Sequence, residues 1–268
     1  MLTRAAPLLA MAAACGLAAG PLAAQDFAPH RAAYNVTPLP GAAGGGVSGS
    51  YAYELRATCD SFTIVQRLRL EFPTGTGTLA HEQQSRIEES RDGRSMRFDH
   101  TSTVSGRRTE RNAGEARLAP GGAGDARFSE PAGQSVALPA DTLFPIGIAR
   151  AVVRRFQAGE NGLEARFFFG DKAKPPRIAN AVIGRVPRRL ADLAVPESGR
   201  ALAEGRQRVY FRVGFFEPDA KDGGTPAYEM GSVTLDNGVE LYGTHEQRDM
   251  SIEYRIVRLE ALEKPTCN

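Results

Sequence analysis

Several residue types are scarce in this sequence of 268 residues, and their scarcity narrows the possible functions. There are four histidines and three cysteines. No two histidines have the short helical spacing of zinc ligands, and no Cys-x-x-Cys pair occurs. The glycine-rich stretches lack the Lys-Ser/Thr ending of a phosphate-binding loop, and there is no Gly-x-Ser-x-Gly elbow. We therefore expect no metal site, no cofactor and no catalytic residues.

A strong excess of either charge is also missing. Lysine and arginine together number 33 and aspartate and glutamate 31, which gives a formal net charge of +2. Nucleic-acid binding normally needs a concentrated basic surface, and this balance gives it no support. We interpret scattered arginines such as Arg107, Arg108, Arg154 and Arg155 as solvated faces, and we expect no nucleic-acid partner.

One polar group could still carry chemistry. His245 and Glu246 are adjacent and Asp249 follows, so a base with an acidic neighbour is conceivable. No nucleophile accompanies them, which favours the simpler interpretation of a polar strand end beside a turn. A hydrolase acting on cell-wall material is therefore our third functional hypothesis, after the two given at the end of this section.

Long apolar runs are absent except near the N-terminus. Arg4 precedes a mostly apolar stretch over residues 5–17, and small residues then lead to Ala24. This order is typical of a secretory signal peptide, so we predict that residues 1–24 are removed and that residues 25–268 form a single domain. Spanning a bilayer takes roughly 20 apolar residues, and no later segment is that long, so we expect no transmembrane segment.

Removal of the signal changes the number of cysteines from three to two. Cys15 follows small residues and could instead mark lipid attachment, but signal-like residues continue beyond it, which favours ordinary cleavage. In an exported chain an even number of cysteines favours a disulfide over free thiols. We therefore predict a bond between Cys59 and Cys267, which would enclose nearly the whole domain. The chain-entropy model gives about 5 kcal/mol for so large a loop, as an upper bound.

Most of the remaining sequence alternates apolar and polar residues with the period of a β-strand. The clearest run spans residues 62–72, and residues 209–215 and 252–256 repeat the pattern. A period of two places one face of each strand on a core and the other in water. The sequence therefore predicts an all-β, mainly antiparallel domain.

Turn signals separate the predicted strands. Asp92-Gly93 and Asn237-Gly238 both tolerate the positive φ angles of tight hairpin turns. Residues 81–117 are polar at most positions, and we interpret them as long, solvent-exposed hairpins. The charged pair Glu88-Glu89 is placed on the surface of one of these hairpins.

One main helix is predicted to plug or cover the sheet. Ala149, Val152, Val153 and Phe156 recur at helical spacing and form one apolar face. Asp141 or Thr142 is expected to cap the helix, with Pro145 in its first turn and Gly159 at its exit. A weaker helix or turn is expected over residues 188–193.

Phenylalanines are concentrated in two of the strands. Phe167-Phe168-Phe169 and Phe215-Phe216 place rings on both strand faces, as expected where a sheet is covered on both sides. Burial in the core is the commoner use of phenylalanine. The alternative is a hydrophobic groove for an acyl chain or an apolar peptide segment, with four candidate lining residues: Phe167, Phe169, Phe211 and Phe215.

Short motifs distributed along the mature chain resemble one known family. They are, in order, His30-Arg31-Ala32-Ala33-Tyr34, Tyr53-Glu54, Cys59-Asp60, Leu138-Pro139, Leu143-Phe144-Pro145, Tyr228-Glu229, Asn237-Gly238-Val239 and Cys267. This series resembles the EipB (envelope integrity protein B) family, and the Leu-Pro…Phe-Pro block is its most specific part. The chain departs from the family pattern after Cys59-Asp60, where Ser61-Phe62 replace a common Gly-Trp.

The resemblance implies a fold, a location and a role. The implied fold is a spiral, incompletely closed β-barrel with a disulfide, and the implied location is the periplasm. The implied role is support of cell-envelope integrity and stress resistance, without an assigned enzymatic activity. We expect partners among periplasmic envelope proteins or cell-wall and lipid components. A carrier of a lipid or lipoprotein acyl chain is the alternative.

Overall fold

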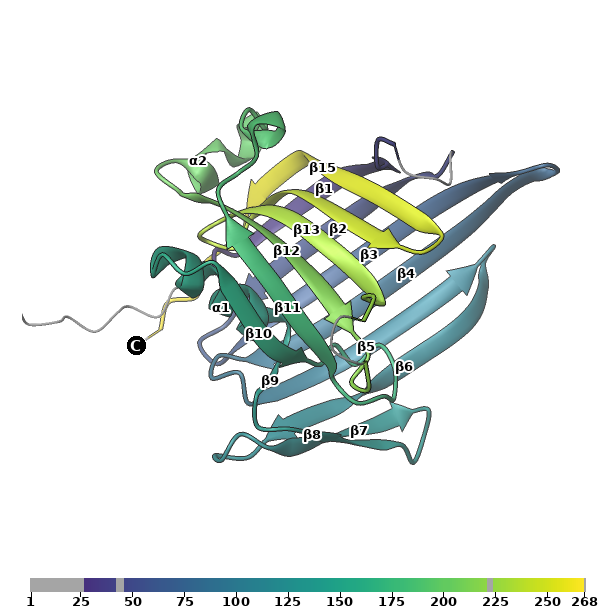
Figure 1. Cartoon of the computed structure of the whole chain (residues 1–268), viewed down its shortest axis with the longest axis vertical. Coiled ribbons are helices and arrows are strands. Elements are labelled where there is room, and N and C mark those ends of the chain that lie inside the picture. The colour runs from purple at the N-terminus through teal and green to yellow at the C-terminus, as the bar shows by residue number, and fades with distance from the viewer. Residues whose placement is uncertain (1–26, 42–45, 221–223, 268) are drawn as a thin grey trace, which may run out of the picture.

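The chain folds around one long sheet that curls into a barrel-like shape (Figure 1). The structure is a computed structural model and describes residues 27–41, 46–220 and 224–267. In these residues the sheet has 15 strands. They are β1 (His30–Pro38), β2 (Ser48–Ala57), β3 (Ser61–Thr74), β4 (Gly77–Ser90), β5 (Ser95–Val104), β6 (Arg107–Leu118), β7 (Gly124–Glu130), β8 (Ser135–Leu138), β9 (Thr142–Leu143), β10 (Gly162–Phe167), β11 (Arg177–Gly184), β12 (Arg208–Phe216), β13 (Tyr228–Leu235), β14 (Glu240–Gln247) and β15 (Met250–Ala261).

The strand order consists of two runs of consecutive antiparallel strands. β1 to β8 form one run and β10 to β15 form the other. β1 pairs with β15, with Tyr34 opposite Ile256, and this pairing joins the two runs. β8 lies at one end of the sheet, and β9, which pairs in parallel with β10, lies at the other. The two ends of the sheet are therefore separated in sequence only by residues 139–141.

The main helix, α1 (Pro145–Gln157), follows β9 and packs inside the curl of the sheet. Ile146 and Val153 join a core cluster that includes Phe62 of β3, whereas Val152 joins a second cluster that includes Val213 of β12. Figure 1 shows α1 beside β10, at the end of the barrel where the C-terminus lies. The sheet surface that carries these two clusters is called the inner face below. The predicted all-β fold with a plugging helix is confirmed.

The alternation predicted for residues 62–72 is confirmed in β3. Phe62, Ile64 and Leu70 are buried, whereas Arg67 and Arg69 between them are exposed. Burial of a large apolar side chain stabilises the fold by about 1.5–3 kcal/mol. Because the apolar residues of β3 share one face, turning that face inward is strongly favoured over the alternative.

The two predicted hairpin turns and the long strands over residues 81–117 are also confirmed. Asp92-Gly93 joins β4 to β5, and Asn237-Gly238 joins β13 to β14. The expectation that Glu89 lies on an exposed surface is wrong, because the carboxylate is 1% exposed on the inner face. In a strand, residues two apart share a face, and Glu89 therefore points the same way as the buried Ile87.

The ends of α1 agree with the sequence only in part. Pro145 begins the helix and Gly159, with φ +74°, follows its C-terminal end, as predicted. Neither Asp141 nor Thr142 caps the helix: the residue before it is Phe144, and no side chain of that residue bonds the first turn. Asp141 is held by Arg166 of β10 instead.

Short helical segments cross the connection between β11 and β12. They are η1 (Arg188–Leu190), η2 (Glu197–Gly199) and α2 (Arg200–Ala203). η1 confirms the turn predicted over residues 188–193, and η2 packs against β15, where Gly199 meets Leu259. The predicted signal peptide, with Cys15, lies outside the described residues.

Candidate functional site

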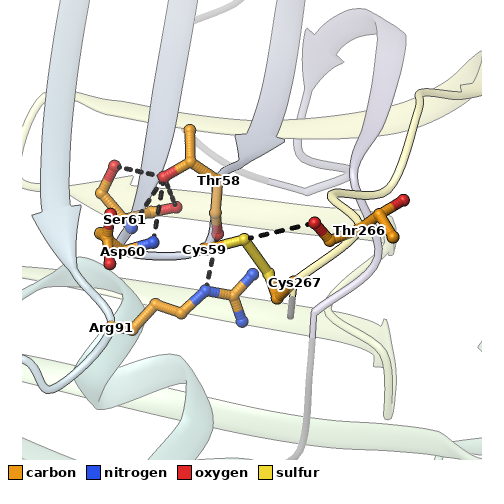
Figure 2. Close-up of a disulfide and its surroundings, with 7 residues drawn as sticks. All are labelled: Thr58, Cys59, Asp60, Ser61, Arg91, Thr266 and Cys267. Atoms are coloured by element: carbon orange, nitrogen blue, oxygen red, sulfur yellow. Dashed lines mark hydrogen bonds between the residues drawn. A yellow bond between two sulfur atoms is a disulfide. The ribbon is translucent and has the colours of Figure 1, made fainter.

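The predicted bond between Cys59 and Cys267 is present and ties the C-terminal tail to the sheet (Figure 2). The two Cα atoms are 5.6 Å apart, and 208 positions separate the cysteines in sequence. Cys59 lies in the turn between β2 and β3. The tail follows β15, which pairs with β1 near the middle of the sheet. The disulfide thus fixes the last residues of the chain to a turn formed by its first strands.

The turn that carries Cys59 is held by a local hydrogen-bond network. The Thr58 hydroxyl accepts from the backbone N–H groups of Asp60 and Ser61, at 3.2 and 3.0 Å. Arg91 Nε donates to the Thr58 carbonyl at 2.8 Å, as Figure 2 shows. The cysteine therefore sits on a pre-formed turn, so the tail docks on an ordered surface.

Two arginines connect this turn to the inner helix. The guanidinium carbons of Arg91 and Arg150 lie 4.6 and 4.7 Å from the centre of the Phe62 ring. Arg150, on α1, also donates to the Arg91 carbonyl at 3.0 Å. Guanidinium groups over an aromatic ring are attracted to its negative face. The disulfide turn, β3 and α1 consequently form one connected structure.

Glu89 supplies the cap that α1 lacks in its own sequence. Its carboxylate accepts from the backbone N–H groups of Ile146 and Gly147, at 2.7 and 2.9 Å. The first N–H groups of a helix have no partner within it, and a negative charge there is also favoured by the helix dipole. Burial raises the pKa of Glu89 to about 7, although the two N–H donors and Arg150 act in the opposite direction.

A row of aromatic rings runs across the inner face. His100 of β5 stacks near Phe169 with ring centres 4.6 Å apart, and its Nε2 is 2.9 Å from the Phe169 carbonyl oxygen. The contacts continue through Phe167 and Phe215, at 6.0 and 5.2 Å, and then through Tyr228. This aromatic row spans the inside of the barrel from β5 to β13.

The four predicted groove residues are distributed unevenly along this surface. Phe167, Phe169 and Phe215 belong to the aromatic row, whereas Phe211 lies further along β12, opposite Ser232 of β13. Phe215 is buried, and the other three are only partly buried. The structure therefore places the groove candidates on the inner face, and a ligand there remains a proposal.

Gly170 is expected to be essential to the packing of Phe98, whose ring stacks on His100 at one end of the aromatic row. A Cβ added there would come within 2.6 Å of the Phe98 ring, whereas one added at Gly159 would meet nothing within 4 Å. Both glycines have positive φ, at +80° and +74°, so they share the backbone cost of a side chain. Gly170→Ala should destabilise the protein by about 1–2 kcal/mol more than Gly159→Ala, as overpacking does. Urea unfolding of the two variants checks this, and equal losses would contradict it.

His245 and Asp249 are not assembled as a catalytic pair. The His245 ring stacks on Tyr228, at 5.2 Å, as an extension of the aromatic row, and burial lowers the pKa of His245. Asp249 is exposed in the turn before β15, and within the described residues no hydrogen bond or ion pair joins it to His245. The interpretation of a polar strand end describes these residues better than a base with its acidic partner.

A second carboxyl, that of the partly buried Glu240 of β14, lies on the inner face. Its Oε1 accepts from the Ser232 hydroxyl at 2.6 Å and from the Tyr254 hydroxyl at 3.3 Å. Burial raises the pKa of Glu240 to about 7, and the two hydroxyl donors offset part of that rise. Sequence analysis missed this residue, because its position depends on a β-bulge between Val233 and Thr234 that alternation does not predict.

The pKa of Glu240 predicts a pH-dependent stability. Its folded pKa of about 7 exceeds the usual glutamate pKa of 4.5, so folding takes up a proton between these values. The stabilising effect is complete below pH 4.5 and is lost as the pH rises through about 7. Glu240→Gln should match the wild type near pH 5 and exceed its free energy of unfolding by about 1–2 kcal/mol at pH 8. Denaturant unfolding across this range tests the difference, and parallel pH profiles would refute it.

A surface cavity of about 220 Å³ lies on the opposite face of the same strands. Tyr210, Arg212, Tyr242 and Glu246 contribute to its lining. Arg212 is paired there with both Glu229 and Glu246. Arg212 and the two glutamates satisfy one another, and Arg189 also lines the cavity.

The described part of the chain contains neither a metal-binding cluster nor a membrane-spanning helix. In residues 27–41, 46–220 and 224–267, no three histidines, cysteines or acidic residues are grouped so that they could hold a metal ion. Over the same ranges, no helix is both long and apolar enough to cross a membrane.

The geometry defines a class of protein: a barrel-like, mostly antiparallel β-sheet with an internal helix and a disulfide-tied tail. Residues 21–263 match the family model described as EipB-like. The chain belongs to the EipB-like family, which confirms the resemblance drawn from its motifs.

A solved structure agrees with this fold. It is the crystal structure of a beta-barrel-like protein, of a domain of unknown function, from Brucella abortus. The two are 22% identical, with a TM-score of 0.78, and the match covers 90% of this chain and 100% of that one. At that identity the likeness concerns the fold alone. The comparison with curated proteins found no match.

Proposed function

We propose that this chain is a non-enzymatic periplasmic protein that supports cell-envelope integrity and stress resistance as a structural or interaction module. Membership of the EipB-like family supports the proposal, and the disulfide between Cys59 and Cys267 carries it. Disulfides persist in oxidising compartments such as the periplasm and are rare in the cytosol. The predicted removal of residues 1–24 as a secretory signal belongs to the same proposal.

The barrel-like sheet offers two surfaces for a partner segment. Its terminal strands, β8 and β9, each have one neighbouring strand, so their outer edges could accept an added strand. The partly buried aromatic row on the inner face is the other surface. Envelope proteins and cell-wall or lipid components are the partners that we propose.

Deletion of the gene, combined with chemical crosslinking in intact cells, tests this role. We expect the deletion strain to become sensitive to detergents and cell-wall antibiotics, and the wild-type gene to restore resistance. Crosslinking should capture envelope proteins or cell-wall material, and fractionation should place the mature chain in the periplasm. An insensitive deletion strain together with a protein that crosslinks to nothing would refute the proposal.

A carrier of a lipid or lipoprotein acyl chain is the second candidate. The observation that favours it is the partial exposure of Phe167 and Phe169 on the inner face, where apolar surface could contact a chain. Native mass spectrometry of protein purified from its own compartment should then show bound lipid. Phe167→Ser with Phe169→Ser should abolish that lipid, whereas Val182→Ser, at a side chain 68% exposed, should not. A lipid-free wild-type protein would exclude this candidate.

A further inference from the structure

Glu240 stands out among the acidic residues of β13 to β15 because it lacks a cationic partner. Glu229 and Glu246 pair with Arg212, and Glu253 pairs with Arg255 at 3.0 Å. No lysine, arginine or histidine of the described chain forms an ion pair with Glu240. Its fixed partners are the hydroxyls of Ser232 and Tyr254, which both donate to Oε1.

Four tyrosines surround this carboxyl on the inner face. The rings of Tyr34, Tyr51 and Tyr254 contact one another with centres 5.2–5.6 Å apart. The Tyr34 hydroxyl donates to the Glu240 carbonyl at 2.9 Å. Tyr53 lies opposite Ala32 on the next strand and is close enough for the Glu240 charge to raise its pKa.

Water reaches part of this group. Tyr34 and Tyr254 are buried, but Tyr51, Tyr53 and Glu240 each keep an intermediate exposure. Phe211, also partly exposed, lies opposite Ser232, so apolar surface adjoins the carboxyl. The inner face therefore places one partly exposed glutamate among aromatic rings, beside an apolar strand.

We infer that Glu240 and its tyrosines form a binding site for the ammonium group of an organic ligand. The ammonium pairs with the carboxylate. The Ser232 and Tyr254 hydroxyls both donate to Oε1, so Oε2 and the remaining lone pairs can accept from the ammonium. Tyrosine rings attract cations to their faces, and that attraction strengthens where water is partly excluded. Apolar substituents of the ligand extend along Phe211. This site does not depend on the proposed envelope function.

The electrostatic surroundings of Glu240 favour a cationic ligand over an anionic one. Tyr34 on β1, Tyr51 and Tyr53 on β2, and Tyr254 on β15 have their pKa values raised, first by burial and then by Glu240, so they stay neutral in the physiological range. An ionised carboxylate in such surroundings lacks compensation, which raises the pKa of Glu240 to about 7. A bound ammonium would supply the missing positive charge.

Calorimetric titration with octylammonium, octanoate and octanol tests the site, since the three probes differ only in their head group. At pH 8 we expect octylammonium to bind at least tenfold more tightly than either of the others. Glu240→Gln should lose that preference and keep the octanol affinity, because the amide oxygen can still accept from Ser232 and Tyr254. Lowering the pH to 6 should weaken octylammonium binding by about tenfold as Glu240 takes up a proton.

Two controls separate the site from general effects. Glu246→Gln removes a carboxylate of the same strand that pairs with Arg212, and octylammonium binding should survive it. Thermal unfolding of Glu240→Gln must show a cooperative transition, and Tyr51→Leu provides a second variant that should weaken octylammonium more than octanol. Equal binding of octylammonium and octanoate by the wild type would overturn the inference. So would octylammonium binding that Glu240→Gln leaves intact.

A second comparison distinguishes a lipid head group from a free amine. Lysophosphatidylethanolamine and lysophosphatidylglycerol with the same acyl chain are offered together, and the retained lipid is identified by mass spectrometry. A preference for the ethanolamine lipid that Glu240→Gln removes identifies a lipid source for the ammonium. Equal retention of both lipids, with octylammonium binding intact, identifies a free organic amine.

Discussion

Replacing both cysteines, as Cys59→Ser with Cys267→Ser, should lower the free energy of unfolding by about 3–5 kcal/mol. The bond closes a loop across 208 positions, and a cross-link removes more entropy from the unfolded chain as its loop lengthens. Guanidinium unfolding of the double variant, compared with the oxidised wild type, measures the loss. The tail after β15 should also exchange its amide hydrogens faster, because it is then held only by its backbone contacts.

The wild type treated with a reductant is the matched control for this variant. It should unfold at the same denaturant concentration as the double variant, because the two share an open loop. Non-reducing peptide mapping of periplasmic protein should find Cys59 joined to Cys267. Two thiols that react freely with an alkylating agent, or an unfolding midpoint that reduction leaves unchanged, would contradict a structural role for the bond.

Glu89→Ala is expected to cost about 2–4 kcal/mol. The substitution leaves the Ile146 and Gly147 N–H groups of α1 without their acceptor, inside a core where each unsatisfied donor costs about 1–3 kcal/mol. Removal of a carboxyl that is itself costly to bury offsets part of this loss. Urea unfolding gives the total, and hydrogen exchange at the first turn of α1 locates it.

Glu88→Ala is the matched control for that substitution. Glu88 is the preceding residue of β4, points to the opposite face and accepts a long hydrogen bond, at 3.5 Å, from the Ser61 hydroxyl. Its loss should change stability by less than about 0.5 kcal/mol, as surface substitutions usually do. Similar losses for both variants would show that the charge of the strand matters rather than the cap.

The sequence predicts the strands well because burial on one face imposes a period of two. β3 shows this directly, since Phe62, Ile64 and Leu70 are buried on the face that alternation assigns to them. The pairing of the cysteines is also predictable, because only two lie beyond the predicted signal peptide. Both predictions depend on local patterns or on simple counting.

The two carboxyls of the inner face could not be predicted so easily. Glu89 shares a face with Ile87, and that parity was a usable signal, but a charged pair beside arginines suggests a surface. Glu240 offered no such signal. The bulge at Val233/Thr234 places Glu240 and Tyr242 on opposite faces although they are two residues apart. A bulge is a property of the paired strands, and one strand's sequence does not reveal it.

The cap of α1 depends on tertiary structure in the same way. Local rules place a polar residue just before a helix, which suggested Asp141 or Thr142. The chain instead supplies the acceptor from β4, through Glu89. This contact exists only after α1 enters the barrel, and no local pattern encodes it.

The position of the two ends of the sheet, β8 and β9, has a consequence for how the polypeptide folds during synthesis. β8 and β9 are neighbours in sequence but lie at opposite ends of the sheet, while β1 must pair with β15, which follows all other strands of the sheet in sequence. Apart from β9, which pairs in parallel with β10, the fold is thus a circular permutation of an up-and-down meander. The first eight strands can form hairpins as they emerge, but β1 keeps an unpaired edge until β15 is available, and such an edge invites aggregation. A permutant that begins at β9 and joins β15 to β1 by a short loop would remove that delay.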